Sequence, residues 1–415
     1  MSSPLRLGLF LFMFSLSFSS CKKDKEAPDV VISSFTDHGQ GGTTISITGS
    51  GFSDKIAENT VTINDQPATV TAATTTALSV KVPAKAGSGK IKVSVGAKSS
   101  VSNNDFTYDW VHMVSTLTGD GTTSTFERPV GLATDGAGTI YFADEYKHKV
   151  FKITPDGILS TLAGSGTVGF KDGNGVNAQF AGPSGVTTDA NGNVYVADRG
   201  NRRIRKITPT GDVSTWAGDG STTNMDLPTG LCFDGAGNMI VADQARSHVI
   251  KITPNPDGSR TFSTVAGSSQ GYADGNAATA KFNWLIDVAV DANGNIYVAD
   301  QGNSRVRKIT PAGYVTTIAG NGTSTPLGYP IGIDIDSKGN IYTADEGNFK
   351  IHKITITPDG TATLSTIAGI GESGYADGPA NTAIFSSPLG LAFDKNGNMY
   401  IGDGNKPRIR KIVLQ

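Results

Sequence analysis

Three similar stretches of the sequence each place an aromatic residue two positions before an Asp-Gly pair and end in Phe. They are GFKDGNGVNAQF (169–180), GYADGNAATAKF (271–282) and GYADGPANTAIF (374–385). An aromatic face beside a carboxylate can hold a sugar, because the ring offers an apolar surface and the carboxylate accepts hydrogen bonds from hydroxyl groups. The candidate ligand-binding residues in these stretches are Phe170, Asp172, Tyr272, Asp274, Tyr375 and Asp377.

The same stretches also allow a purely structural interpretation. Each final Phe would fill a gap between neighbouring structural units, and each Asp-Gly pair would only turn the chain. Loops carried by a rigid scaffold are common sites of function. Both interpretations are compatible with the sequence.

A further candidate site breaks a regular pattern. The motif Pro-x-Gly begins five of six corresponding segments, but the fourth segment along the chain reads Trp284-Leu285-Ile286-Asp287, so that Asp287 stands where the others have Gly. A carboxylate beside a Trp could contact a sugar hydroxyl or a cation. Local repacking explains the substitution equally well. The regular copies begin at Pro129, Pro183, Pro228, Pro330 and Pro388.

These candidates lie within a repeat that fills the chain from about residue 114 onward. Its clearest copy, NIYVADQGNSRVRKITPAGYVTTIAG (295–320), predicts three strands separated by Gly, Asn and Pro turns, and DVAVD before it predicts a fourth. Four-stranded repeats spaced by roughly 45–58 residues are typical of β-propeller blades. The Asp that ends the second strand marks six copies: Asp144, Asp198, Asp243, Asp300, Asp345 and Asp403.

The two ends of the repeat region are incomplete. An outer-strand signature, VSTLTG (114–119), precedes the first inner strand, whereas the last repeat ends at RIRKIVLQ without one. Pairing these ends completes a sixth blade and leaves no free edge in the ring. The sequence therefore predicts an all-β chain with a six-bladed propeller, whose three insertions decorate every other blade of one face.

Two family resemblances accompany this pattern. The block that contains GNhYVAD and KIT, where h is apolar, resembles the NHL repeat from Val114 to Gln415. The preceding segment, with Gly49-Ser50-Gly51-Phe52 and a closing Phe106-Thr107-Tyr108, resembles the immunoglobulin-like IPT/TIG family. That resemblance implies a small β-sandwich that acts as a spacer or adhesion module.

The N-terminus has the features of a secretion signal. A short segment with Arg6 precedes the apolar run LGLFLFMFSLSF, which is too short to span a membrane. The sequence FSSC resembles a bacterial lipobox, which implies cleavage before Cys21 and lipidation of its thiol. We expect a signal peptide at 1–20, a tether at 21–28, the IPT/TIG-like sandwich at 29–108 and the propeller at 109–415.

The composition of the chain limits the kinds of partner that it can bind. With 52 glycines in 415 residues and a formal net charge of −2, the chain is rich in turns and lacks the basic excess of a nucleic-acid binder. If Cys21 carries lipid, Cys232 has no partner for a disulfide, and its alternation with apolar residues predicts a small buried side chain. Membrane contact is expected through the lipid anchor only.

We therefore expect a lipid-anchored protein of the bacterial outer membrane, periplasmic or surface-exposed, whose propeller binds a glycan, a protein or a peptide on the insertion-bearing face. The sequence favours a binding protein over an enzyme and indicates no catalytic residue, metal site or cofactor. One alternative is a metal-dependent lactonase or lyase, as in some NHL-like propellers, although the five histidines are not placed to converge. A purely structural interaction module is the other alternative.

Overall fold

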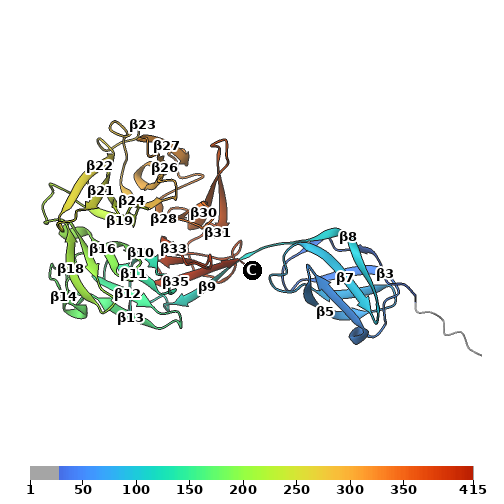
Figure 1. Ribbon diagram of the computed structural model, residues 1–415. Helices are drawn as coiled ribbons and strands as arrows, with labels where there is room; N and C mark the ends of the chain where they lie inside the picture. Colours follow the sequence, from blue (N-terminus) through green and yellow to red (C-terminus); the bar gives the residue numbers. More distant parts are fainter. Residues whose placement is uncertain (1–27, 415) are drawn as a thin grey trace, which may run out of the picture. The chain divides into compact units, whose positions relative to one another are not determined.

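The computed structural model describes residues 28–414, which form two compact units that divide between Asp109 and Trp110. Cys21, the expected signal peptide and all but the last residue of the expected tether lie outside the described residues. Strands dominate both units, and residues 28–414 contain short 3-10 turns but no α-helix. The prediction of an all-β chain is confirmed (Figure 1).

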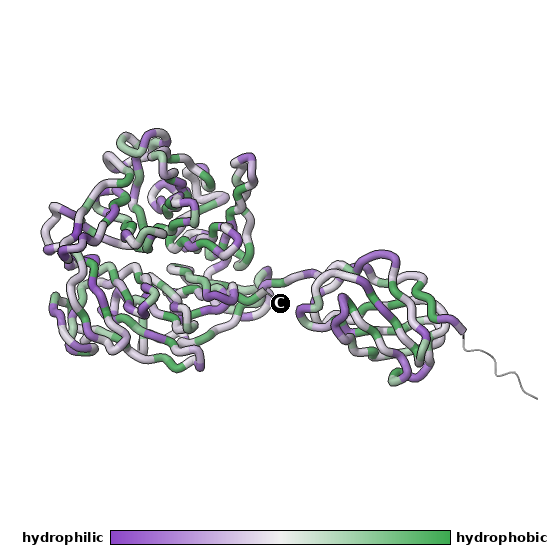
Figure 2. The backbone as a smooth tube through the Cα atoms, in the orientation of Figure 1, coloured by the Kyte–Doolittle hydropathy of each residue, from purple (hydrophilic) through white to green (hydrophobic). Residues whose placement is uncertain are grey.

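The N-terminal unit is the predicted immunoglobulin-like sandwich. Its strands hydrogen-bond in the order β1-β3-β6-β5-β4-β7-β8-β2. Apolar and polar residues alternate along them, as Figure 2 shows, so one side of each strand can enter a common core that contains Ile47, Val80, Val93 and Phe106. The strands are β1 (Val31–Phe35), β2 (His38–Gly39), β3 (Thr44–Ser50), β4 (Asn59–Ile63), β5 (Gln66–Ala73), β6 (Ala77–Lys81), β7 (Gly89–Val95) and β8 (Lys98–Tyr108).

The second unit is the six-bladed propeller, in which each blade is an antiparallel meander. The first strand of each blade lies nearest to the middle of the ring (Figure 1). From blade 1 to blade 6, the inner strands are β10 (Pro129–Thr134), β15 (Pro183–Thr188), β19 (Pro228–Phe233), β24 (Leu285–Val290), β28 (Pro330–Ile335) and β33 (Pro388–Phe393). The second strands are β11 (Ile140–Asp144), β16 (Val194–Asp198), β20 (Met239–Asp243), β25 (Ile296–Asp300), β29 (Ile341–Asp345) and β34 (Met399–Asp403).

The third and fourth strands complete each blade. The third strands are β12 (Lys149–Ile153), β17 (Arg203–Ile207), β21 (His248–Pro254), β26 (Arg305–Ile309), β30 (Lys350–Ile356) and β35 (Arg408–Leu414). The outer strands are β13 (Leu159–Ala163), β18 (Asp212–Ala217), β22 (Arg260–Ala266), β27 (Tyr314–Ala319), β31 (Ala362–Ala368) and, for blade 6, β9 (His112–Thr118).

Strand β9 closes the ring as the sequence predicts. It pairs antiparallel with β35, and Val114 lies opposite Ile412. Blade 6 therefore combines the first propeller strand with the last three. Apolar side chains from each pair of neighbouring blades form a separate cluster, and the cluster between blades 6 and 1 includes Phe126, Phe142 and Ile409.

Each of the three insertions adds a short fifth strand to the outer edge of the blade that follows it. These strands are β14 (Gly173–Asn174) against β18, β23 (Gly275–Asn276) against β27, and β32 (Gly378–Pro379) against β9. The final Phe of each insertion is fully buried between two blades, as the structural interpretation expects, at Phe180, Phe282 and Phe385. Blades 2, 4 and 6 thus have five strands, and blades 1, 3 and 5 have four.

Candidate functional site

The insertion carboxylates are held by arginines of the third strands. In blade 4, Arg307 is fully buried and donates from Nε to Asp274 at 3.0 Å and from Nη1 to Asp300 at 2.7 Å. Its Nη2 also donates to the backbone oxygen of Ala273 at 2.8 Å. A buried guanidinium needs such a set of acceptors to offset its lost hydration. Arg205 and Arg410 pair with Asp172 and Asp377 through Nη2, and the buried Nε atoms of these two arginines have no hydrogen-bond partner among the described residues.

The insertion aromatics lie flat on a second set of arginines. The Tyr272 ring centroid is 3.8 Å from the Arg305 guanidinium carbon, and Phe170 and Tyr375 lie 3.9 Å from those of Arg203 and Arg408. These rings remain between 40% and 46% exposed. Although they are accessible, none of the six insertion candidates lines the central cavity. The structure therefore separates them from Trp284 and Asp287, which do line it.

The Asp at the end of each second strand anchors the loop that leads to the inner strand. In blade 4, Asp300 is fully buried and accepts the backbone N–H of Asn283 at 2.8 Å and the side-chain amide of Asn303 at 2.8 Å. Equivalent bonds occur in every blade, to the N–H groups of Glu127, Ala181, Asp226, Gly328 and Ser386. The six aspartates thus fix the backbone around one end of the central channel, which we call the mouth.

A cavity of about 620 Å³ follows the axis of the propeller and is lined by the inner strands of all six blades. Pockets of roughly 300–1,000 Å³ are usual for small-molecule sites. Neighbouring inner strands lie close together at the glycine of the Pro-x-Gly motif. A Cβ atom on Gly185 would come within 2.3 Å of the Thr229 backbone oxygen. Close packing between neighbouring inner strands therefore explains the repeated glycine.

Trp284 stands at the mouth in an unusual backbone conformation. Its φ is +52°, close to the +60° of Gly182, which holds the same place in blade 2. A left-handed conformation costs a non-glycine residue about 1–3 kcal/mol and is often retained at functional sites. The side chain is 58% exposed and lines the cavity, so this strain holds a large aromatic surface where a ligand can contact it.

Charged side chains from several blades form an arc on the rest of the mouth. Glu145 accepts from Arg128 Nε at 3.1 Å and from Arg199 Nη1 at 3.4 Å. Arg199 also donates to Gln244 at 2.6 Å, and Arg128 Nη2 lies 3.9 Å from Glu346. We call Arg128, Glu145, Arg199 and Glu346 the charged arc. All four side chains are 23–32% exposed, and three of them, Arg128, Glu145 and Arg199, line the cavity.

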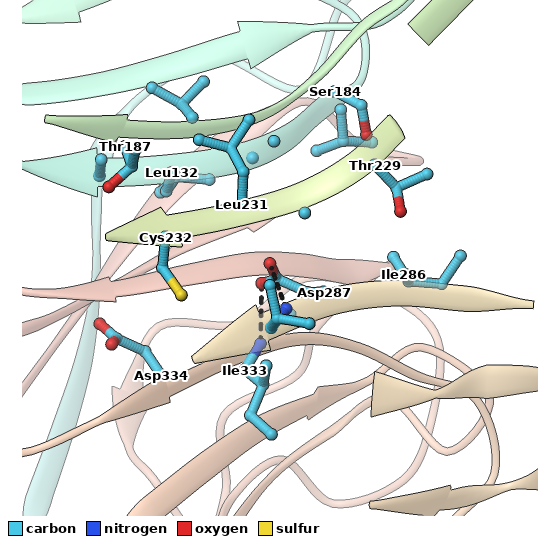
Figure 3. Close-up of a pocket in the computed structure, with 18 of the residues that line it drawn as sticks. Leu132, Ser184, Thr187, Thr229, Leu231, Cys232, Ile286, Asp287, Ile333 and Asp334 are labelled. Atoms are coloured by element: carbon cyan, nitrogen blue, oxygen red, sulfur yellow. Dashed lines mark hydrogen bonds between the residues drawn. The ribbon is translucent and has the colours of Figure 1, made fainter. Parts of the chain in front are cut away.

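Deeper in the cavity, Figure 3 shows Asp287, Asp334 and Cys232 around one space. Asp287 accepts the N–H groups of Val288 at 2.9 Å and Ile333 at 3.0 Å, and so joins blade 4 to blade 5. Asp334 joins blade 5 to blade 6 in the same way. Cys232 is partly exposed to the cavity, whereas the sequence predicts a buried side chain.

The pKa values of these three deep groups are raised above their ordinary values. Burial raises the pKa of Asp287 to about 7 and that of Asp334 to about 6, although backbone N–H donors favour their charged forms. Burial, together with the carboxylates of Asp287, Asp334 and Asp234, raises the pKa of the Cys232 thiol well above its usual value. The thiol is therefore protonated at neutral pH.

The charged arc is not among the residues predicted for the site, although the sequence carries a signal for it. Glu145, Arg199 and Glu346 each follow directly after a loop-anchoring Asp. This position varies from blade to blade through the set Glu145, Arg199, Gln244, Gln301, Glu346 and Gly404. Variation at a position that the repeat places at the mouth distinguishes these residues from those that build the blades.

Two further structural properties concern the described residues alone. Residues 28–414 include no group of three or more His, Cys, Asp or Glu side chains arranged to hold a metal ion. Within the same range, no helix has the length and apolar character of a membrane span.

Comparison with known proteins identifies both units. Residues 31–108 match the IPT/TIG domain, and residues 180–207, 282–309 and 327–354 match the NHL repeat. The chain is also 40% identical over 90 residues to Protein SUPPRESSOR OF QUENCHING 1, chloroplastic, from Arabidopsis thaliana. That match covers 21% of this chain and 8% of the plant protein.

Several solved structures share the fold. An auxiliary nutrient binding protein from Bacteroides ovatus has a TM-score of 0.64 and 19% identity, over 94% of this chain and 98% of that one. A protein of unknown function from Bacteroides thetaiotaomicron has a TM-score of 0.60 and 21% identity over the same shares. Streptogramin B lyase has a TM-score of 0.51 and 14% identity, over 74% of this chain and 98% of the lyase. The chain consists of an IPT/TIG domain followed by a six-bladed β-propeller of NHL repeats.

Proposed function

We propose that this protein is a lipid-anchored binding protein of the bacterial outer membrane, and that its propeller captures a glycan at the mouth of the central cavity. The observation that carries the proposal is Trp284, which is 58% exposed beside the cavity in a left-handed conformation that the equivalent Gly182 adopts without strain. Retaining a Trp at such a position favours a contact function for its ring.

The surroundings of Trp284 support a sugar as the ligand. A saccharide presents apolar C–H faces, which pack on an aromatic ring, and many hydroxyl groups, which both donate and accept hydrogen bonds. The arc supplies donors from Arg128 and Arg199 and acceptors from Glu145, and Gln301 adds an amide on the side of Trp284. A peptide is the second candidate, because the same groups could bind its backbone amides.

The cellular location is part of the proposal and rests on the sequence. The apolar segment before Cys21 supports secretion and lipidation, and the charged tether KKDKEAP supports an outer-membrane location. Two or more acyl chains would hold the protein stably at a membrane. In this arrangement the IPT/TIG domain acts as a spacer between the anchor and the propeller.

A nutrient role fits this arrangement. The protein from Bacteroides ovatus that shares the fold is described as an auxiliary nutrient binding protein. At 19% identity that likeness shows the fold alone. The inference of a nutrient glycan therefore depends on the residues at the mouth.

A glycan-binding screen with matched variants tests the proposal. Trp284→Gly removes the ring and relieves the strained backbone, so we expect binding to fall by tenfold or more while thermal stability stays equal or rises. Tyr314→Ala is the control, because Tyr314 is 54% exposed but lies on outer strand β27 of the same blade. Equal glycan binding by wild type and Trp284→Gly, or no glycan binding by the wild type, would refute the proposed site.

A further inference from the structure

The two arginines of the charged arc share one carboxylate, that of Glu145. Glu145 Oε2 accepts from Arg128 Nε at 3.1 Å, while its Oε1 accepts from Arg199 Nη1 at 3.4 Å. Glu346 adds a second carboxylate, which lies 3.9 Å from Arg128 Nη2 and accepts from Ser387 Oγ at 2.7 Å. Two arginines and two carboxylates therefore form one linked group with no net charge.

This pairing changes what the two arginines can bind. An unpaired guanidinium offers a planar fork that matches a carboxylate or a phosphate. Here one edge of each fork is already directed at Glu145. An acidic ligand that approached Arg128 or Arg199 would also meet the negative charge of Glu145, and like charges that lie close together strongly disfavour a partner.

The side chains deeper in the cavity also disfavour an acidic ligand. Asp287 and Asp334 line it, and the hydrogen bonds that their carboxylates accept come from backbone N–H groups. Trp284 and Gln301 of blade 4 also line the cavity, and neither carries a charge. The hydroxyl groups of a neutral saccharide can accept from the remaining guanidinium N–H groups and donate to the carboxylates. Such a ligand brings no anion into the cavity.

We propose that Glu145 determines ligand specificity, because by occupying both Arg128 and Arg199 it makes the mouth selective for neutral over acidic saccharides. This inference rests on the proposed glycan-binding function. It assigns the arginines a role in hydrogen bonding to hydroxyl groups and excludes recognition of uronic acids by them while Glu145 is in place.

The test uses pairs of oligosaccharides that differ only in charge. Each uronic acid oligosaccharide is compared with its carboxyl-reduced form by calorimetry on the folded protein. We expect the wild type to bind the neutral member at least tenfold more tightly. Glu145→Ala should shift the ratio of affinities at least tenfold towards the acidic member, and binding of that member should weaken with added salt. Glu145→Gln keeps the size of the side chain, and should shift the ratio in the same direction.

Glu127→Ala is the matched control. Glu127 belongs to the same blade and pairs with Lys147 at 3.4 Å, but it does not line the cavity, so its loss should leave the ratio unchanged. A wild type that binds acidic members as tightly as neutral ones, or Glu145 variants that change both members by one factor, would overturn the inference and leave the proposed function standing. Failure of the wild type to bind any pair would overturn both.

Discussion

The buried guanidinium of Arg307 donates from Nε to the Asp274 carboxylate at 3.0 Å and thereby fixes an insertion to the third strand of the following blade. The same guanidinium reaches the loop-anchoring Asp300 at 2.7 Å. One side chain thus links the insertion, the blade and, through Asp300, the loop that carries Trp284. Arg205 and Arg410 make the same links in blades 2 and 6.

Arg307→Ala should lower the free energy of unfolding by about 3–5 kcal/mol, because it leaves Asp300 buried without its cation. Arg305→Ala, two residues earlier on the same strand, removes a guanidinium that lies against the exposed Tyr272 ring and should cost about 1 kcal/mol. Urea denaturation of the two variants gives the comparison. Equal losses would show that the buried ion pairs do not hold the insertion.

Phe282→Ala should destabilise the propeller by about 3–5 kcal/mol, because its ring is fully buried between blades 3 and 4. Tyr272→Ala, in the same insertion, removes a ring that is 46% exposed and should cost about 1 kcal/mol or less. Thermal melting of both variants checks this. Similar losses would mean that the two aromatic rings share one packing role.

Removal of β9 should destabilise the propeller strongly. Val114 is 2% exposed, and Leu117 packs against the cluster between blades 6 and 1, so each contributes roughly 1.5–3 kcal/mol through burial. A chain that starts at residue 121 also exposes the edge of β35. It should melt well below a chain that starts at residue 109, and equal melting temperatures would contradict closure by this strand.

Stability should fall as the pH rises from about 4 towards 7. Burial raises the pKa of Asp287 to about 7 and that of Asp334 to about 6, so in this range the folded protein binds more protons than the unfolded chain. Each group lowers the free energy of unfolding by up to about 1.4 kcal/mol per pH unit between its unfolded and folded pKa values. Asp287→Asn should reduce this slope, and an unchanged slope would place its pKa near the ordinary value.

The sequence predicts the architecture well because the architecture repeats. Six copies of one pattern specify the strands, the turns and the ring closure, and the half-complete ends identify β9 as the partner of β35. The loop-anchoring aspartates can also be recognised in the sequence, but the hydrogen bonds that they accept from backbone N–H groups cannot. Local pattern and overall fold agree along most of the propeller.

The surroundings of the insertions are harder to predict, because they depend on which side chains meet across strands. Arg205, Arg307 and Arg410 stand seven residues after their anchoring aspartates, whereas the blades without insertions have Phe151, Ile250 and His352 there. Arginine thus occurs at this position only in the blades that an insertion precedes. This correlation within the sequence would have indicated an ion pair for Asp172, Asp274 and Asp377.

Closure by β9 also bears on how the protein can reach its folded state. Arg408 donates to the backbone oxygen of Asp120 at 2.9 Å across 288 residues of sequence. The propeller strand that is synthesised first therefore pairs with the propeller strand that is synthesised last. Contacts between residues so distant in sequence slow folding. Until β35 is synthesised, β9 lacks its partner strand and blade 6 cannot form. Closure of the propeller must therefore follow synthesis of β35, whereas the N-terminal domain contains all its own strands and can fold earlier.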